Sequence, residues 1–195
     1  SHGSGVDWGR DEGGHFWLGG GQPTLVIEEF SDYQCPHCRA VHAKLRQLVL
    51  EAAGKVKLVH HHFPLDEHCN PMLKRPFHPK ACQLSALAQC AGVSGKFWDA
   101  NDRLFELGAE DGPVDVPTFA RTLGLETSAL QACVDAPETK AALGADITLG
   151  MELKLRGTPA FRIDGKVYMA GIPGELLRAV APHAAATFPP PAVDE

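Results

Sequence analysis

The sequence lacks any hydrophobic run close to the ~20 residues that a helix needs to cross a bilayer. It also lacks a basic cluster, because 18 Lys and Arg stand against 24 Asp and Glu, which gives a formal net charge of -6. This balance repels a phosphate backbone, so nucleic acid is not expected as a partner. The 20 glycines and 15 prolines follow no collagen-like period, and no internal repeat is present. These features point away from membrane-spanning, fibrous and nucleic-acid-binding proteins.

What the sequence does have is the composition of an ordinary globular protein. Its 195 residues, 44% hydrophobic and 22% charged, suffice for one compact domain with an inserted lobe. The six cysteines are too few for a small disulfide scaffold, but an even number permits three bridges in an oxidising compartment. The first five residues, Ser-His-Gly-Ser-Gly, have the composition of a cloning scar and include no signal peptide. The compartment therefore has to be inferred from the chemistry of the cysteines.

A strand, a helix and a second strand are predicted in the first third of the chain. Residues 24–30 form a short apolar run that is typical of a central strand buried on both faces. Over residues 36–53 apolar side chains recur at helical spacing, and Gly54 ends the helix. Residues 55–64 then predict a second strand, parallel to the first after the helical crossover.

The rest of the chain predicts a helical insert, a hairpin and a last helix. Helical spacing of apolar residues marks residues 81–90, 97–107, 116–123, 128–134 and 138–155. Strands at 160–163 and 167–170 flank the turn Asp164-Gly165, and residues 173–180 form the last helix. The predicted fold class is therefore α/β, in the order βαβ, helical insert, ββα.

This pattern divides the chain into two domains with two arms. We expect a sheet domain from residues 23–65 and 156–183, and an inserted helical subdomain from residues 66–155. The Gly-rich residues 1–22 and the Pro-rich residues 184–195 are expected to form a loosely packed N-terminal arm and a flexible tail.

The motif Cys35-Pro36-His37-Cys38 stands where the first strand gives way to the helix. A helix N-terminus presents unpaired N–H groups and a partial positive charge, which stabilise a thiolate at Cys35. Pro36 suits the first helical turn because its missing N–H would have no partner there. His37 adds a donor or a positive charge that lowers the pKa of Cys35 further, whereas Cys38 falls one turn inward. The motif predicts a reactive exposed sulfur and a buried resolving one.

Two other interpretations of this motif remain open, a structural bridge and half of a zinc or copper site. A metal site needs further ligands, and the candidates are His60, His61, His62, His68 and Cys69. Alternate residues of a strand face opposite ways, however, and no second pair of cysteines at this spacing exists. The histidine run is therefore better explained as the end of a strand than as a ligand set.

The chain also resembles a known family. The run from Val26 to Cys38, the later Gly157-Thr158-Pro159 and the helical lobe between them are similar to the DsbA-like thiol-disulfide oxidoreductases of the thioredoxin superfamily. The resemblance covers residues 14–183, and the active-site tetrapeptide is identical to that of DsbA. It implies a thioredoxin-like fold with an inserted all-helical subdomain.

The resemblance also implies roles for residues outside the tetrapeptide. Thr158-Pro159 would be the cis-proline loop, whose backbone pairs with an extended substrate segment. DsbA itself has valine before this proline, whereas threonine is common in isomerases and in many other DsbA-like proteins, which weakens the case for a pure oxidase. Glu29, six residues before Cys35, matches the buried acid that exchanges protons near the resolving cysteine. The alternative is an exposed strand carboxylate, because Glu28 is adjacent and side chains alternate along a strand.

The function implied is disulfide exchange with exported proteins through Cys35 and Cys38, most simply as an oxidase. A disulfide isomerase or reductase of the same fold, a copper- or zinc-binding protein and a redox-inactive peptide-binding module are the alternatives. The expected partners are unfolded, cysteine-containing proteins and a membrane redox partner similar to DsbB or to vitamin K epoxide reductase. We expect no cofactor, a monomer, and a periplasmic or otherwise extracytoplasmic location.

The other four cysteines allow three pairings when all are oxidised. A bridge from Cys69 to Cys82 would hold a proline-containing loop that has few apolar anchors. Cys90 and Cys133 lie near the ends of two predicted helices, and some DsbA-like proteins join helices of the insert at similar positions. We therefore expect Cys69 with Cys82 and Cys90 with Cys133, as structural bridges. The alternative is four buried thiols that act as small hydrophobic residues.

Overall fold

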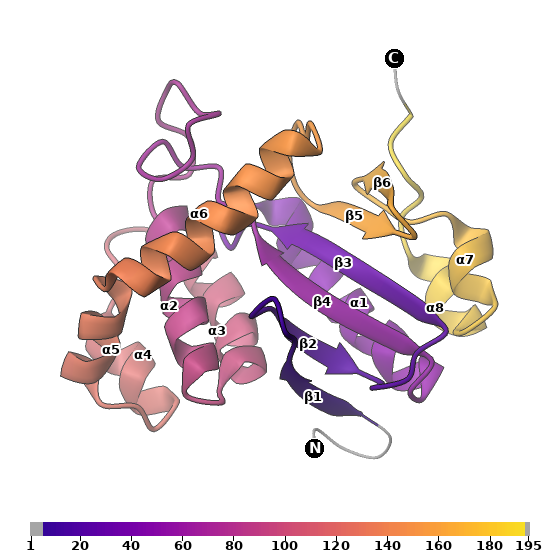
Figure 1. Cartoon of the computed structure of the whole chain (residues 1–195), viewed down its shortest axis with the longest axis horizontal. Helices are drawn as coiled ribbons and strands as arrows, with labels where there is room; N and C mark the ends of the chain where they lie inside the picture. The colour runs from indigo at the N-terminus through magenta and orange to yellow at the C-terminus, as the bar shows by residue number, and fades with distance from the viewer. Residues whose placement is uncertain (1–5, 194–195) are drawn as a thin grey trace. The chain divides into compact units, whose positions relative to one another are not determined.

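The computed structural model describes residues 6–193 and divides the chain into two compact units. Of the described residues, the sheet unit comprises 6–31, 37–61 and 153–193, and the helical unit comprises 32–36 and 62–152. Figure 1 shows the strands of the first unit and the helices α2 to α6 of the second.

The described residues of the sheet unit form a six-stranded sheet in the order β1-β2-β4-β3-β5-β6. The strands are β1 (Asp7–Arg10), β2 (Phe16–Gly19), β3 (Leu25–Ser31), β4 (Val56–His62), β5 (Ala160–Ile163) and β6 (Lys166–Met169). The central neighbours β3 and β4 run in the same direction in Figure 1, as expected for strands joined by a helical crossover. β5 pairs antiparallel with β3, with Phe30 opposite Ala160, and β6 pairs antiparallel with β5. The predicted α/β class is thereby confirmed.

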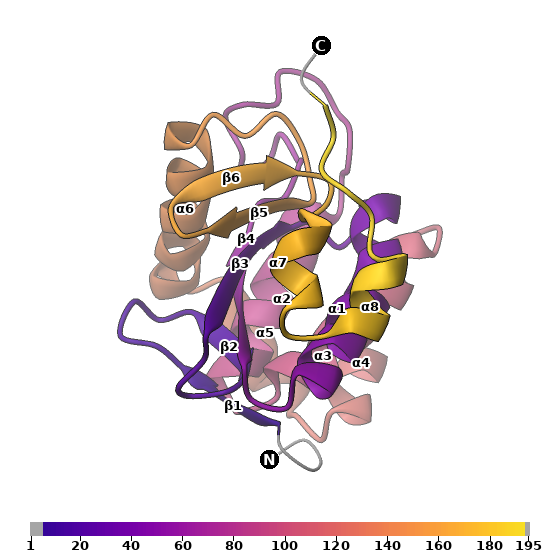
Figure 2. The ribbon, with the colours of Figure 1, turned by 90° about the vertical axis from the view of Figure 1, so that its right-hand side faces the viewer.

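One apolar stripe fixes the orientation of α1 (Pro36–Ala52). Its buried residues recur at helical spacing and are Cys38, Val41, Leu45, Leu48, Val49 and Ala52. Figure 2 shows α1, α7 (Gly174–Arg178) and α8 (Pro182–Thr187) together on one side of β3 and β4. The Glu51 carboxylate of α1 accepts hydrogen bonds from the backbone N–H groups of His183, at 3.0 Å, and Ala184, at 2.8 Å. These bonds hold the start of α8 against the end of α1.

In the helical unit, α2 is the central element. The helices are α2 (Ala81–Val93), α3 (Phe97–Ala109), α4 (Val116–Thr122), α5 (Thr127–Val134) and α6 (Pro137–Glu152). α2 packs against α3, α5 and α6, and its small and apolar side chains are buried on nearly every side. A helix that is apolar all round is stable only where neighbours surround it, as they do here.

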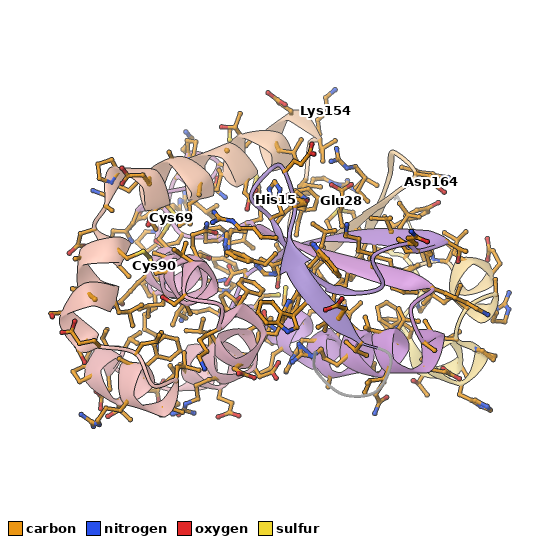
Figure 3. The ribbon with its side chains drawn as sticks, turned by 60° about the horizontal axis from the view of Figure 1, so that its bottom comes forward. His15, Glu28, Cys69, Cys90, Lys154 and Asp164 are labelled. Atoms are coloured by element: carbon orange, nitrogen blue, oxygen red, sulfur yellow. A yellow bond between two sulfur atoms is a disulfide. The ribbon has the colours of Figure 1, made fainter. Side chains whose placement is uncertain are left out.

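Two disulfides hold α2 to its surroundings within the helical unit. Cys69 bonds to Cys82, with the two sulfurs 2.06 Å apart, and Cys90 bonds to Cys133, with the two sulfurs 2.14 Å apart. These are the two pairings expected from the sequence, and Figure 3 labels one cysteine of each. The first ties the loop of residues 63–80 to the first turn of α2, and the second ties the end of α2 to α5.

The expectation of a loose N-terminal arm is wrong for the described part of residues 1–22. β1 and β2 add an antiparallel hairpin to the sheet, and Trp17 of β2 lies opposite Val59 of β4. Some of the glycines in this stretch, Gly19 and Gly20 among them, allow close packing of two backbones. A Cβ on Gly20 would lie 1.9 Å from the carbonyl oxygen of Gly54, so only glycine fits this approach of two backbones. The expected cloning scar, residues 1–5, lies outside the described residues.

The expectation of a flexible tail at 184–195 is also wrong for the described residues up to 193. α8 extends to Thr187, and the buried ring of Phe188 packs edge-on against Phe161, with their centroids 6.0 Å apart. Beyond it, the backbone N–H of Ala192 donates to the Met169 carbonyl at 2.8 Å. Prolines here favour an extended segment that packs beside β6, which composition alone does not distinguish from a free tail. The insert also differs in its bounds, because the helical unit takes in residues 32–36 and 62–65 and ends at Glu152.

We expect both disulfides to contribute to stability by limiting the freedom of the unfolded chain. In the chain-entropy model, a sequence separation of 13 corresponds to about 3 kcal/mol and one of 43 to about 4 kcal/mol. Cys69→Ser/Cys82→Ser and Cys90→Ser/Cys133→Ser should therefore lower the free energy of unfolding in urea by roughly these amounts. Peptide mapping of unreduced protein should recover both linked pairs, and wild-type stability in both double variants would contradict the structural role.

Candidate functional site

The tetrapeptide Cys35-Pro36-His37-Cys38 lies where the sequence placed it, at the start of α1 after β3. β3 ends at Ser31 and α1 begins at Pro36, so Cys35 immediately precedes the first residue of the helix. Both cysteines are thiols, and Cys35 keeps 6% of its surface exposed against 1% for Cys38. The prediction of an openly exposed Cys35 is thus wrong, because the thiol is largely covered. The order of exposure is as expected, with Cys38 more deeply buried.

Cys35 lies at the N-terminus of a helix whose own first turn carries no anion. α1 is 17 residues long, and its first turn carries no acidic side chain. Its partial positive charge is therefore available to an anion at Cys35. Pro36 takes the first helical position, where a missing N–H has no cost, and the exposed His37 follows it.

The turn that carries Cys35 is fixed within the helical unit by Tyr33 and Gln34. The Tyr33 hydroxyl donates to the Asn101 side-chain oxygen at 2.9 Å, and its buried ring meets Phe105 edge-on. The Gln34 side-chain oxygen accepts the backbone N–H of Lys80 at 2.7 Å. Because Tyr33 and Gln34 are both anchored, the backbone leading into Cys35 is held in one conformation.

Asp32 completes this turn, and sequence reasoning missed it. Its carboxylate is fully buried; Oδ1 accepts the backbone N–H of Gln34 at 2.7 Å and Oδ2 that of Leu65 at 2.8 Å. Oδ2 also lies 2.7 Å from Nδ1 of His78, and the Asp32 carbonyl accepts the Cys35 N–H at 3.1 Å. The bond to Gln34 is an Asx-turn, a local signal readable from an Asp at the end of a strand. The contact with His78 has no such signal.

Thr158 and Pro159 lie at the start of β5, in the sheet unit. Their peptide bond is cis, and the buried Pro159 comes just before Ala160, which pairs with Phe30 near the carboxyl end of β3. Antiparallel pairing thus brings Pro159 to the end of β3 that leads on to α1. The Pro159 carbonyl accepts the backbone N–H of Ala170 at 2.8 Å, while Thr158 is half-buried.

Glu29 is buried in the sheet unit and faces α1. Only 4% of the residue is exposed, and Oε1 lies 3.5 Å from Nδ1 of His60. Burial raises the pKa of its carboxyl to about 7, although the charges of His42 and Arg46 on α1 oppose this shift. Cys38 and His42 are one turn apart on α1, so the acid lies on the side of the sheet that the resolving cysteine faces. Near neutral pH this carboxyl can both hold and release a proton.

Glu28 points to the opposite face of β3 and is held as an anion. Arg162 donates two hydrogen bonds to its carboxylate, at 2.6 and 2.8 Å, and Nε2 of His61 lies 3.0 Å away. Burial, the largest single influence, raises its pKa, but these partners together lower it to about 2. Figure 3 labels Glu28 together with His15, whose ring lies 4.2 Å from that of His61. Of the two adjacent acids, Glu29 is thus the buried one.

The histidines considered as metal ligands have different protein partners. His60 lies beside Glu29, whereas His61 pairs with Glu28 and stacks on Phe30 with 4.6 Å between ring centroids. In the helical unit, Nε2 of His62 lies 3.2 Å from the Gln89 side-chain oxygen. His68 pairs with Asp66, and Cys69 is in a disulfide. The structure does not gather this set of residues into one ligand shell.

Comparison with known proteins agrees with this architecture. A family model described as Thioredoxin matches residues 11–180. A thioredoxin-like oxidoreductase from Silicibacter pomeroyi superposes with a TM-score of 0.70 at 24% identity, covering 91% of this chain and 95% of that one. DsbA2 of Pseudomonas aeruginosa gives 0.64 at 24% identity, covering 83% and 90%, and BdbD of Bacillus subtilis gives 0.61 at 19%, covering 77% and 82%. At these identities the likeness shows the fold.

Curated relatives found by sequence are longer proteins. The chain is 24% identical over 145 residues to the Na(+)/H(+) antiporter NhaA 3 of Salinispora tropica, covering 74% of this chain and 21% of the antiporter. For NhaA 1 of Salinispora arenicola the identity is 24% over 163 residues, covering 84% and 24%. The chain therefore spans about a fifth to a quarter of these relatives. None of its helices in residues 6–193 has the length and apolar composition to cross a membrane.

The raised pKa of Glu29 predicts a specific dependence of stability on pH. The folded protein holds this proton up to about pH 7, whereas the unfolded chain releases it near 4.5. The contribution of neutral Glu29 to the free energy of unfolding is fully present below pH 4.5 and is lost as the pH rises through 7. By linkage, the loss amounts to at most about 3 kcal/mol. Glu29→Gln should remove this dependence, so its stability relative to the parent protein should increase between pH 5 and 8.

Urea unfolding at pH 5, 6, 7 and 8 measures this, in a Cys35→Ser/Cys38→Ser background so that no active-site thiol titrates. Glu28→Gln is the matched control. In the parent protein, the lowered pKa of Glu28 contributes stability at pH values above 4.5, the pKa of this group in the unfolded chain. This stability is lost only as the pH falls toward 2. Glu28→Gln should therefore be destabilised by a constant amount across this range. Parallel pH profiles for Glu29→Gln and its parent would contradict the buried neutral acid.

Proposed function

Since the chain belongs to the thioredoxin family, we propose that it is a thiol-disulfide oxidoreductase whose working pair is Cys35 and Cys38. The observation that carries this proposal is the position of Cys35 directly before α1, with Cys38 buried one turn inside the same helix. The helix end favours a thiolate at the first sulfur, and burial shields the second from a substrate.

In the oxidised protein, a substrate thiolate attacks the sulfur of Cys35 in the Cys35–Cys38 disulfide. Cys38 leaves with the electron pair of the S–S bond and takes up a proton, and a mixed disulfide joins Cys35 to the substrate. A second substrate thiolate attacks the substrate sulfur of this bond, and Cys35 leaves as a thiolate. The substrate gains one disulfide, and the protein takes up two electrons and becomes the dithiol.

Two groups of the sheet unit support these steps. Glu29, with a pKa near 7, supplies the proton that Cys38 takes up on leaving, and it receives that proton back when the disulfide re-forms. Thr158 and Pro159, beside the end of β3, are the residues that we assign to contact with an extended substrate segment. Both roles follow those implied by the resemblance to DsbA-like proteins.

The direction of exchange that we propose is oxidation of cysteine-containing proteins outside the cytoplasm. The two disulfides of the helical unit favour an oxidising compartment, because such bonds are rare in reducing ones. One solved structure of the same fold is described as a periplasmic thioredoxin-like protein from Salmonella enterica. A monomer that is re-oxidised by a membrane redox partner fits this role. Thr158 in place of valine keeps isomerase and reductase activity as the alternatives.

The two cysteines should behave differently when replaced. Cys35→Ser should abolish the acceleration that the protein gives to the reduction of insulin by dithiothreitol, because no sulfur remains that a substrate can reach. Cys38→Ser should retain Cys35 as a nucleophile and accumulate mixed disulfides that non-reducing gels and mass spectrometry detect. Cys90→Ser/Cys133→Ser is the control for loss of a cysteine outside the motif. Insulin reduction that Cys35→Ser accelerates as strongly as the parent protein does would overturn the assignment.

The reduction potential of the Cys35–Cys38 pair tests the direction of exchange. A stabilised thiolate favours the dithiol, so we expect a potential less negative than about -180 mV, the range of isomerases and oxidases. Equilibration with glutathione buffers, followed by thiol alkylation and mass analysis, measures it. A potential near that of thioredoxin, about -270 mV, would assign the chain to the reductase alternative.

A further inference from the structure

A second histidine, outside the tetrapeptide, is linked to Cys35 within the helical unit. It is His78, from the loop that precedes α2, and its Nδ1 lies 2.7 Å from Oδ2 of Asp32. Asp32 is tied to the reactive cysteine directly, because its carbonyl accepts the Cys35 N–H at 3.1 Å. Asp32 thus contacts both the ring of His78 and the backbone of Cys35.

His78 is held in place from several directions. Its backbone N–H donates to the Leu65 carbonyl at 3.1 Å, and its own carbonyl accepts the N–H of Ala81 at 3.1 Å. Its ring stacks on Phe77, with 4.1 Å between centroids and 18° between planes. The side chain is 14% exposed, and the Cys69–Cys82 bond closes the loop around it. A ring fixed in this way presents its charge at a constant position.

We propose that protonated His78, oriented by the buried Asp32, stabilises the thiolate of Cys35 and so sets its reactivity; this rests on the proposed exchange function. His37, the histidine inside the tetrapeptide, is exposed and precedes Cys38, whereas His78 is partly buried and belongs to the same unit as Cys35. The charge that stabilises the thiolate therefore comes in part from a residue distant in sequence.

The protonation of His78 is consistent with this role. Burial of the ring, the largest single influence, lowers its pKa, but the hydrogen bond to Asp32 and the negative charges of Asp32, Cys35 and Asp66 together raise it. Because an interaction between two charges is reciprocal, a thiolate that favours protonated His78 is itself favoured by it. The two N–H donors on Asp32 compensate part of its negative charge, which limits its repulsion of the thiolate.

The direct test needs no substitution and no turnover. In wild-type protein, the pKa of His78 measured by NMR should be higher when Cys35 is a thiolate than when Cys35 and Cys38 form a disulfide. This comparison separates the inference from the function, because it holds or fails whether or not the protein exchanges disulfides with substrates. Equal pKa values of His78 in the two redox states would overturn the inference. An active Cys35→Ser variant in the insulin assay would overturn the proposed function and would leave this inference untouched.

The second test replaces the charge and keeps the hydrogen bond. In a Cys38→Ala background, His78→Gln can still donate to Asp32, but thiolate absorbance should show the pKa of Cys35 raised by about half a unit to one unit. In the protein with both cysteines, the equilibrium with glutathione should shift about three- to tenfold toward the disulfide, which is ~15 to 30 mV for two electrons. His78→Lys, which restores a positive charge, should recover at least half of both shifts.

His68→Gln is the matched control, because His68 lies in the same loop and also pairs with an aspartate, Asp66. The groups that raise the pKa of His68 are Asp66 and Glu67, and Cys35 is not one of them. This variant should leave the pKa of Cys35 and the glutathione equilibrium unchanged. Equal shifts in His68→Gln and His78→Gln, or none in His78→Gln with native circular dichroism, would overturn the proposed charge interaction.

Discussion

The strand that leads to Cys35 carries two carboxyl groups and is followed by a third, in a protein whose formal net charge is -6. The negative charge of each acid is compensated in a different way. Glu28 is neutralised by Arg162 and His61, and Glu29 keeps its proton to about pH 7. Asp32 is surrounded by N–H donors and the ring of His78. The local chemistry therefore depends on how these acids are compensated.

This compensation of charge depends on the pairing register of the strands as much as on the types of residue present. The antiparallel pairing of β3 with β5 places Arg162 directly opposite Glu28, so a shift of one residue would turn the arginine to the other face. The same pairing sets Pro159 at the end of β3. In the helical unit, the Cys69–Cys82 bond holds the loop that brings His78 to Asp32. The pairing thus fixes Pro159 within the sheet unit, and the loop fixes His78 beside Asp32 within the helical unit.

The sequence predicted the elements better than the contacts between them. Periodicity and turn signals sufficed for β3, α1, β5 and the tetrapeptide at the strand-helix junction, since these depend on local patterns. Glycines that allow close backbone approach were misread as a flexible arm, because composition does not distinguish Gly20 packed on Gly54 from a free glycine. The sequence alone did not distinguish the buried acid of Glu28 and Glu29, because this depends on how β3 pairs with its partner strand. The pair of Asp32 and His78 is a tertiary contact without any local pattern.

If the two proposals hold together, the two sulfurs of one motif are controlled by groups with opposite effects. His78 keeps Cys35 charged by supplying a positive charge, which makes it a good leaving group. Glu29 supplies Cys38 with a proton, because burial makes its carboxyl a proton donor near neutral pH. The difference between the sulfurs then does not depend on their exposure alone, which differs by only a few per cent, 6% against 1%. Two environments that push the protonation of Cys35 and Cys38 apart determine which sulfur holds the substrate and which one leaves.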